Sequence, residues 1–147
     1  MKVTEALPLH HKYCDTLFAD AEEAASEGDW PRCVSLYSSF HQALLEHFGQ
    51  EENALFPAFE TATGMTMGPT QVMRMEHEQM REFLTRLAQA VADKNADAFA
   101  GAADTLLILM QQHNMKEENI LYPMCDQHLG GRADLAEQLQ NALPTGA

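Results

Sequence analysis

The sequence predicts an all-α protein, an antiparallel up-down-up-down four-helix bundle with a short C-terminal helix. Apolar residues recur at helical spacing along four long segments, and no stretch shows the alternation typical of a strand. The connections between these segments are short, which favours antiparallel neighbours. The chain has 147 residues, 46% of them hydrophobic, which is enough for one domain with its own core. We expect a single domain over residues 1–147, with the bundle over about 4–125.

The first half of the chain predicts one helical hairpin. The first helix is expected over about residues 4–27, followed by a Gly-Asp-Trp-Pro turn. In this turn Asp29 can cap the next helix and Pro31 can open it. The second helix is expected to end at about Phe56, because Pro57 follows.

The second half predicts another hairpin and a tail. A loop rich in Gly and Thr covers residues 61–70 and leads to a third helix over about 70–92. The fourth helix is expected over about 97–122, ending before Pro123. A Gly-Gly pair then separates a short polar tail helix, over about 132–142.

Composition excludes some partners. The formal net charge is −13, whereas nucleic acids and anionic membrane surfaces bind clusters of Lys and Arg. No apolar run is long enough to span a membrane, and the first residues do not resemble a signal peptide. The three cysteines, Cys14, Cys33 and Cys125, lack the spacing of a metal or redox motif and are expected to be reduced, buried thiols. We therefore expect a cytoplasmic protein.

One motif occurs twice, as HFGQEENALFP at residues 47–57 and HNMKEENILYP at 113–123. In each copy a histidine ends an apolar helical stripe, and a glutamate follows four residues later on the same face. These glutamates are Glu51 and Glu117. Ionised glutamate is rarely buried without a partner, because its desolvation is costly. The motif therefore predicts a charged partner for them in the core.

The repeat extends beyond the motif. An offset of 66 residues superimposes the two halves of the chain and also places His11 on His77. In each half the two histidines are 36 residues apart, and the midpoint, Asp29 or Asn95, lies in a predicted hairpin turn. Residues equidistant from such a turn lie at the same height, here about 25 Å from it. Docking the hairpins about an approximate twofold axis brings six side chains into one layer: His11, His47, Glu51, His77, His113 and Glu117.

These six side chains are the predicted metal ligands. Imidazole suits Fe, Zn, Cu and Ni, and a carboxylate can bridge two ions or chelate one. A lone core histidine is usually satisfied by a hydrogen bond, and a lone His-x3-Glu pair is a weak signal. Four histidines at mirror-related heights, with two duplicated glutamates, favour a site for two metal ions.

The other polar residues near this layer are not predicted to be metal ligands. His10 lies on an apolar stripe as good as that of His11, and only the repeat register prefers His11. His41 lies about 240° around the helix from His47, and His128 lies past the predicted fourth helix, so both are expected away from the site. Four further residues are expected to contact the ligands from behind or to lie on the surface: Glu52, Asn53, Glu118 and Asn119.

The order and spacing of the six candidate ligands resemble the hemerythrin-like family, also called HHE cation-binding domains, over about residues 7–125. The resemblance implies a four-helix bundle holding two iron ions in an oxo- or hydroxo-bridged di-iron centre, ligated by histidines and bridged by two carboxylates. Iron rests on the resemblance, since the spacing alone would also permit zinc or manganese. Ferritin-like bundles differ, because their inner helices carry Glu-x-x-His.

The chain departs from the oxygen carriers of this family. Carriers have a fifth histidine on the third helix, where this chain has Met73 and Arg81 one turn from His77. They also have His-x4-Asp on the last helix in place of His-x3-Glu. The resemblance is to symmetrical four-His, two-Glu domains involved in iron or oxygen sensing and in repair of damaged iron centres. Repair proteins usually add an N-terminal cysteine-bearing domain, for which this chain has no room, so repair is not the expected role.

The leading hypothesis is a non-haem di-iron protein that senses, binds or reacts with dioxygen or nitric oxide, rather than a dedicated enzyme. The alternatives are a di-iron enzyme that reduces peroxide, dioxygen or nitric oxide, iron-centre repair, and iron storage. No separate acid–base pair is visible in the sequence, which counts against an enzyme. One buried site holds few ions, which counts against storage. The oligomeric state is left open.

Overall fold

A computed structural model describes residues 1–145 and contains helices but no strands over that range. The elements are α1 (Ala6–Ser26), α2 (Trp30–Gln50), η1 (Glu51–Leu55), α3 (Phe56–Thr63), α4 (Pro69–Ala92), α5 (Ala96–Lys116), η2 (Glu117–Leu121), α6 (Tyr122–His128) and α7 (Ala133–Ala142). The two η elements are single turns of π-helix. The predicted all-α bundle is confirmed.

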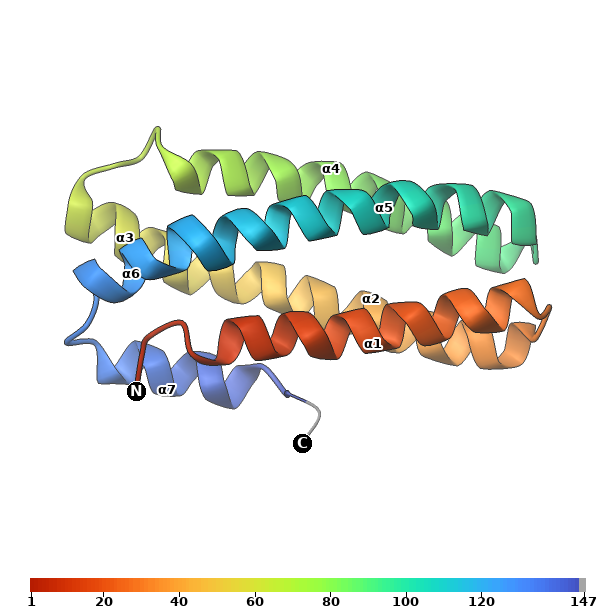
Figure 1. Cartoon of the computed structure of the whole chain (residues 1–147), viewed down its shortest axis with the longest axis horizontal. Helices are drawn as coiled ribbons and strands as arrows, with labels where there is room; N and C mark the ends of the chain where they lie inside the picture. Colours follow the sequence, from red (N-terminus) through yellow and green to blue (C-terminus); the bar gives the residue numbers. More distant parts are fainter. Residues whose placement is uncertain (146–147) are drawn as a thin grey trace.

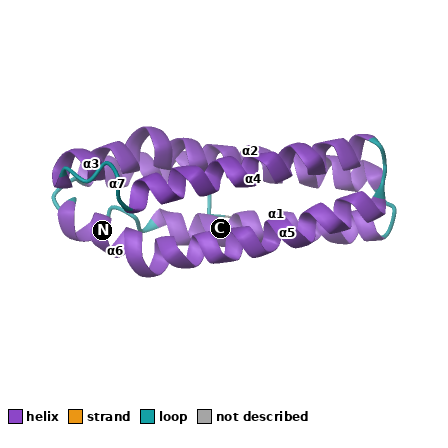
Figure 2. Ribbon diagram, turned by 90° about the horizontal axis from the view of Figure 1, so that it is seen from above, coloured by secondary structure: helices purple, strands orange, loops and turns teal. Residues whose placement is uncertain are grey.

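Two antiparallel hairpins form the bundle (Figure 1). Helix α1 packs against α2 and α5, α4 packs against α2 and α5, and the turns of both hairpins lie at the same end of the molecule. Seen from above, α2 and α4 lie along one edge of the bundle, and α1 and α5 lie along the other (Figure 2). The tail helix α7 lies along α1 and α2 near the opposite end. It begins one residue after its expected start and ends where expected.

The two hairpin turns are built alike. In the first turn Gly28 has a φ of 71°, and in the second Lys94 has a φ of 51°. In both turns two backbone N–H groups beyond the helix end reach back to its last carbonyls, which is the Schellman arrangement. The side chains of Asp29 and Asn95 then cap the next helices. The predicted midpoints of the repeat therefore lie in equivalent turns.

The predicted ends of the second and fourth helices, Phe56 and Tyr122, are wrong. Both helices continue, because a π-turn precedes each proline. The N–H of Phe56 donates to the carbonyl of Glu51, and that of Tyr122 to the carbonyl of Glu117. A new α-helical segment thus starts just before the proline, whose missing N–H is tolerated in a first turn.

The core has two apolar clusters, one on each side of the polar layer. The cluster on the side of the hairpin turns includes Phe18, Phe40 and Leu84. The other includes Leu7 and Phe56, and α7 covers part of it. As predicted, three free cysteines are buried: Cys14, Cys33 and Cys125. Over the described residues 1–145, no helix is both long and apolar enough to cross a membrane.

Candidate metal centre

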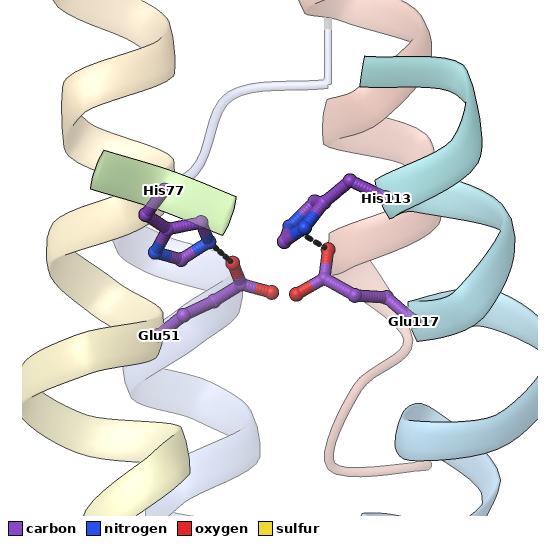
Figure 3. A group of neighbouring side chains, drawn as sticks. All are labelled: Glu51, His77, His113 and Glu117. Atoms are coloured by element: carbon purple, nitrogen blue, oxygen red, sulfur yellow. Dashed lines mark ion pairs between the residues drawn. The ribbon is translucent and has the colours of Figure 1, made fainter. Parts of the chain in front are cut away.

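All six predicted ligands meet between the two apolar clusters. One group comprises Glu51, His77, His113 and Glu117, and a second comprises His11, His47 and Glu117; within each group the candidate ligand atoms lie within 4.8 Å of one another. All six side chains are buried. Figure 3 shows the first group, with both carboxylates pointing toward each other between the histidines.

Each hairpin contributes one pair of histidines. His11 and His47 form the first subsite, with ring centroids 4.6 Å apart, and His77 and His113 form the second, with centroids 4.9 Å apart. The carboxylate of Glu51 lies between the pairs, with one oxygen 3.5 Å from His47 Nε2 and the other 3.1 Å from His77 Nε2.

The Glu117 carboxylate also spans the two subsites. Its Oε1 lies 3.2 Å from His11 Nε2 and 3.2 Å from His113 Nε2. Both glutamates therefore occupy the position of a bridging carboxylate between two histidine pairs. The Nε2 atoms of all four histidines face these carboxylates.

The other ring nitrogen of each histidine also has a partner. Three rings face a carboxylate through Nδ1: His11 and Glu118 at 2.6 Å, His77 and Glu52 at 2.6 Å, and His113 and Glu76 at 2.8 Å. The Nδ1 of the fourth ring, that of His47, lies 2.8 Å from the Nδ1 of His10. A carboxylate on Nδ1–H fixes ring orientation and raises the basicity of Nε2, as is common behind metal-binding histidines.

Two of these carboxylates are themselves held by cations. Arg81 contacts both oxygens of Glu52, at 2.8 and 2.9 Å, and Lys116 pairs with Glu76. Hydrogen bonding by His113 and Lys116 lowers the pKa of Glu76 to about 2. Burial opposes the charge of Glu52, but hydrogen bonds from His77 and Arg81 outweigh it and lower its pKa to about 2. Both carboxylates are therefore ionised acceptors at neutral pH.

The pKa values of the histidines differ because their surroundings differ. Burial opposes the charge of His11 and His113, but nearby glutamates outweigh it, raising the pKa of His11 to about 9 and of His113 to about 10. Burial and the neighbouring His47 and His11 lower the pKa of His10 to about 3, so His10 is neutral. A neutral His10 can accept a hydrogen bond from His47 Nδ1–H and leave His47 Nε2 free to bind a metal ion.

Tyr122 is a site residue that the sequence analysis missed. Its Oη lies 2.6 Å from Glu51 Oε2, 3.0 Å from Glu117 Oε1, 3.3 Å from His11 Nε2 and 3.4 Å from His47 Nε2. Five residues of α-helix place a side chain about 140° from the starting face. The π-turn instead makes five residues close to one full turn, so Tyr122 returns to the face of Glu117. The only available signal was the aromatic-proline pair that ends both copies of the motif.

The structure also places the remaining polar residues. His10 and Glu76 contact the Nδ1 atoms of ligand histidines, on the side away from the bridging carboxylates. This role was not predicted for either residue. Glu52 and Glu118 do so as expected. Four residues lie outside the cluster: His41 stacks on Tyr37, and Asn53, Asn119 and His128 are exposed.

Buried polar atoms that make no hydrogen bond indicate whether metal ions fit this cluster. Among the described residues, four such atoms belong to the cluster: Glu51 Oε1, His77 Nε2, His113 Nε2 and Glu117 Oε2. A buried polar atom without a partner is costly, and groups of this kind usually bind a water or an ion. Imidazole nitrogens and carboxylate oxygens are the donors that iron and zinc accept. The donor set fits two metal ions.

Comparison with known proteins agrees with this chemistry. The chain is 28% identical over 109 residues to the iron-sulfur cluster repair protein YtfE of Enterobacter sp. (strain 638), which covers 67% of this chain and 50% of that protein. It is 28% identical over 103 residues to YtfE of Escherichia coli O81 (strain ED1a), which covers 63% of this chain and 47% of that protein. The chain thus spans about half the length of these curated relatives. No solved structure gives a significant match.

A family model agrees with the expected resemblance. The hemerythrin HHE cation binding domain matches residues 2–125, a range that includes all six predicted ligands. The match confirms the expected cation-binding bundle, and the buried cluster of histidines and glutamates suits the predicted di-iron centre. The chain belongs to the hemerythrin HHE cation-binding domain family.

Proposed function

We propose that this chain is a cytoplasmic di-iron protein that senses, binds or reacts with a small diatomic ligand, dioxygen or nitric oxide. In this proposal two iron ions are ligated by His11, His47, Glu51, His77, His113 and Glu117. The observation that carries it is the convergence of four histidine Nε2 atoms on two buried bridging carboxylates. The family match supports a cation at this place.

The surrounding residues prepare the ligands. Iron supplies an electrophilic, redox-active centre for diatomic molecules when it is bound. Glu52, Glu76 and Glu118 hold three imidazoles through Nδ1–H, so that Nε2 carries the lone pair toward the ion. Two divalent ions offset the charge of Glu51 and Glu117, which burial makes costly without a partner.

The residues around His77 support a centre that senses or reacts with its ligand over a carrier. The turn on either side of His77 carries Met73, which packs in the core, and Arg81, which pairs with Glu52. Neither side chain replaces the fifth histidine of the oxygen carriers. Two histidines per ion leave room for an external ligand in addition to the bridging carboxylates.

A second candidate function is repair of iron-sulfur clusters. The names of both curated relatives favour it, although the chain matches only about half of each. These names count against the expectation that repair is not the role of this chain. A direct test is recovery of an iron-sulfur enzyme damaged by nitric oxide or peroxide after addition of the iron-loaded protein. Recovery that depends on bound iron would favour repair over sensing.

Metal analysis tests the main proposal. The purified protein should hold two iron atoms per chain when reconstituted anaerobically with Fe(II). The His77→Ala variant should lose about one of them, whereas His41→Ala, which removes a histidine outside the cluster, should keep both. Fewer than two ions in the wild-type protein, or equal loss in both variants, would contradict the proposed centre.

A further inference from the structure

The 66-residue repeat makes each subsite a reference for the other. His11 and Glu118 in the first subsite correspond to His77 and Glu52 in the second, with the two groups of each pair 2.6 Å apart in both. The same contacts therefore occur in both halves. A pair of equivalent positions that carry different residues marks a chemical difference between the subsites.

One such difference lies at Tyr122, whose repeat equivalent is Phe56. The two rings occupy matching places. The Tyr122 ring stacks on that of His11 with a centroid distance of 5.8 Å and an interplanar angle of 20°. The Phe56 ring stacks on that of His77 at 5.8 Å and 23°. Only the hydroxyl distinguishes them, and it lies in the first subsite.

A second difference between the subsites is the group that contacts Nδ1 of a ligand histidine. His10 is the repeat equivalent of Glu76. Glu76 provides a carboxylate to Nδ1 of His113, whereas His10 provides only a neutral ring to Nδ1 of His47. Both differences therefore set the first subsite apart from the second: it has a hydroxyl where the second has only a phenyl ring, and a neutral imidazole where the second has a carboxylate.

The position of the Tyr122 hydroxyl matches that of a metal ligand. Donor atoms about 2.1 Å from one ion and at right angles to each other lie about 3.0 Å apart. The four distances from Tyr122 Oη to the ligand atoms of Glu51, Glu117, His11 and His47 run from 2.6 to 3.4 Å and scatter around that value. An ion held by those four atoms would have the hydroxyl oxygen beside it as a fifth donor.

The second subsite has an apolar wall in the equivalent place. Phe56 has no oxygen to offer, and the Phe48 ring stacks on His77 with a centroid distance of 4.0 Å. The Nε2 atoms of His77 and His113 lie 3.1 and 3.2 Å from carboxylate oxygens of Glu51 and Glu117, and among the described residues no hydroxyl comparable to that of Tyr122 lies beside them. An ion held there by four protein donors would keep a coordination position beside aromatic carbon, which suits a weakly polar diatomic molecule.

We propose that the two subsites are inequivalent: Tyr122 completes the His11–His47 subsite as an oxygen ligand, and external ligands bind at the His77–His113 subsite beside Phe56. This inference rests on the proposed di-iron centre. When the hydroxyl binds a ferric ion it loses its proton to solvent. The first ion is then held by five protein donors and the second by four, so the two halves of a symmetrical repeat perform different tasks.

Spectroscopy of the ferric protein tests the tyrosine ligand. Wild-type protein with two irons per chain should show visible phenolate-to-iron charge transfer, with tyrosine ring modes enhanced in its resonance Raman spectrum. Tyr122→Phe should lose both signals while keeping two irons. Tyr13→Phe, which removes a hydroxyl from a surface pocket beside His10, should keep them. Absence of the signals from the di-iron wild-type protein would overturn the tyrosine assignment.

Azide titration tests which subsite is open. The ferric wild-type protein should bind one azide per chain, and Tyr122→Phe should bind a second. Phe56→Tyr places a hydroxyl in the second subsite and should weaken azide binding at least tenfold. Should that variant fail to fold, Tyr122→Phe still decides the question. One azide in both wild-type and Tyr122→Phe protein, or none in either, would overturn the assignment of the open subsite. A protein that holds fewer than two irons would instead contradict the proposed centre.

Discussion

His10 and His47 face each other through their Nδ1 atoms, which lie 2.8 Å apart, and their rings stack with centroids 5.0 Å apart. This contact places His10 on the outer side of His47, away from the carboxylates that Nε2 faces. His11 instead directs its Nε2 at Glu117, 3.2 Å away. The two adjacent histidines of α1 therefore have different positions relative to the candidate metal centre.

The first prediction separates these adjacent histidines. His11→Ala should lose about one of two bound ions per chain, because it removes a ligand of the first subsite. His10→Ala should keep both ions, with affinity for the ion at the His11–His47 subsite reduced by about tenfold, the lower end of what loss of a supporting contact costs. Metal analysis with titration against a competing chelator measures both. Equal loss in the two variants would show that His10 also binds metal.

The second prediction concerns protons released on metal binding. In the metal-free protein, burial opposes the charge of both rings, but the charges of nearby glutamates and hydrogen bonds to them outweigh it. They raise the pKa of His11 to about 9 and of His113 to about 10, so both rings are protonated at pH 7. An ion must displace the Nε2 proton, while Nδ1–H stays on its carboxylate. Binding at pH 7 should therefore release protons, and affinity should rise as the pH increases toward these pKa values.

Calorimetry can check this second prediction. Titrations in buffers of different ionisation enthalpy give the number of protons released at each pH. The number should fall as the pH approaches the raised pKa values, because the rings then lose their protons before the metal ion arrives. A heat of binding that does not depend on the buffer at pH 7 would contradict the prediction.

The third prediction concerns the second hairpin turn. Lys94 has a φ of 51°, where its repeat equivalent is Gly28 at 71°. A residue with a Cβ atom pays a penalty in this conformation, and glycine does not. Lys94→Gly should therefore raise the free energy of unfolding by about 1 kcal/mol, as measured by urea denaturation. Gly28→Ala is the matched control and should lower it by a similar amount. A less stable Lys94→Gly variant would mean that the lysine side chain contributes more than the strain costs.

The fourth prediction concerns the reaction with air. The centre has Met73 and Arg81 where the carriers have a fifth histidine, and a phenolate from Tyr122 as the fifth donor would stabilise the ferric state over the ferrous state. The ferrous protein should therefore oxidise in air and require added reductant to return to the ferrous state. Repeated cycles of aeration and degassing, followed by optical spectra, measure this. A complex that releases dioxygen on degassing alone would favour a carrier.

The sequence by itself determined the bundle, the hairpin turns and the six-residue layer. These follow from periodicity and from one offset, because residues at equal distance from an antiparallel turn must lie at equal height. Asp29 and Asn95 therefore located both turns, and the duplicated motif located Glu51 and Glu117. Local pattern and chain geometry are sufficient for this kind of inference, since neither depends on the exact packing of side chains.

Only the tertiary structure decided how the helices pass their prolines and which groups surround the histidines. A π-turn adds one residue to a helical turn without changing the composition of the segment, so the return of Tyr122 to the face of Glu117 has no signature in a 3.6-residue period. The choice between His10 and His11 likewise depends on where α2 and η2 lie against α1. Contacts between distant segments depend on the packing of whole helices, and a stripe on one helix cannot specify its neighbour's atoms.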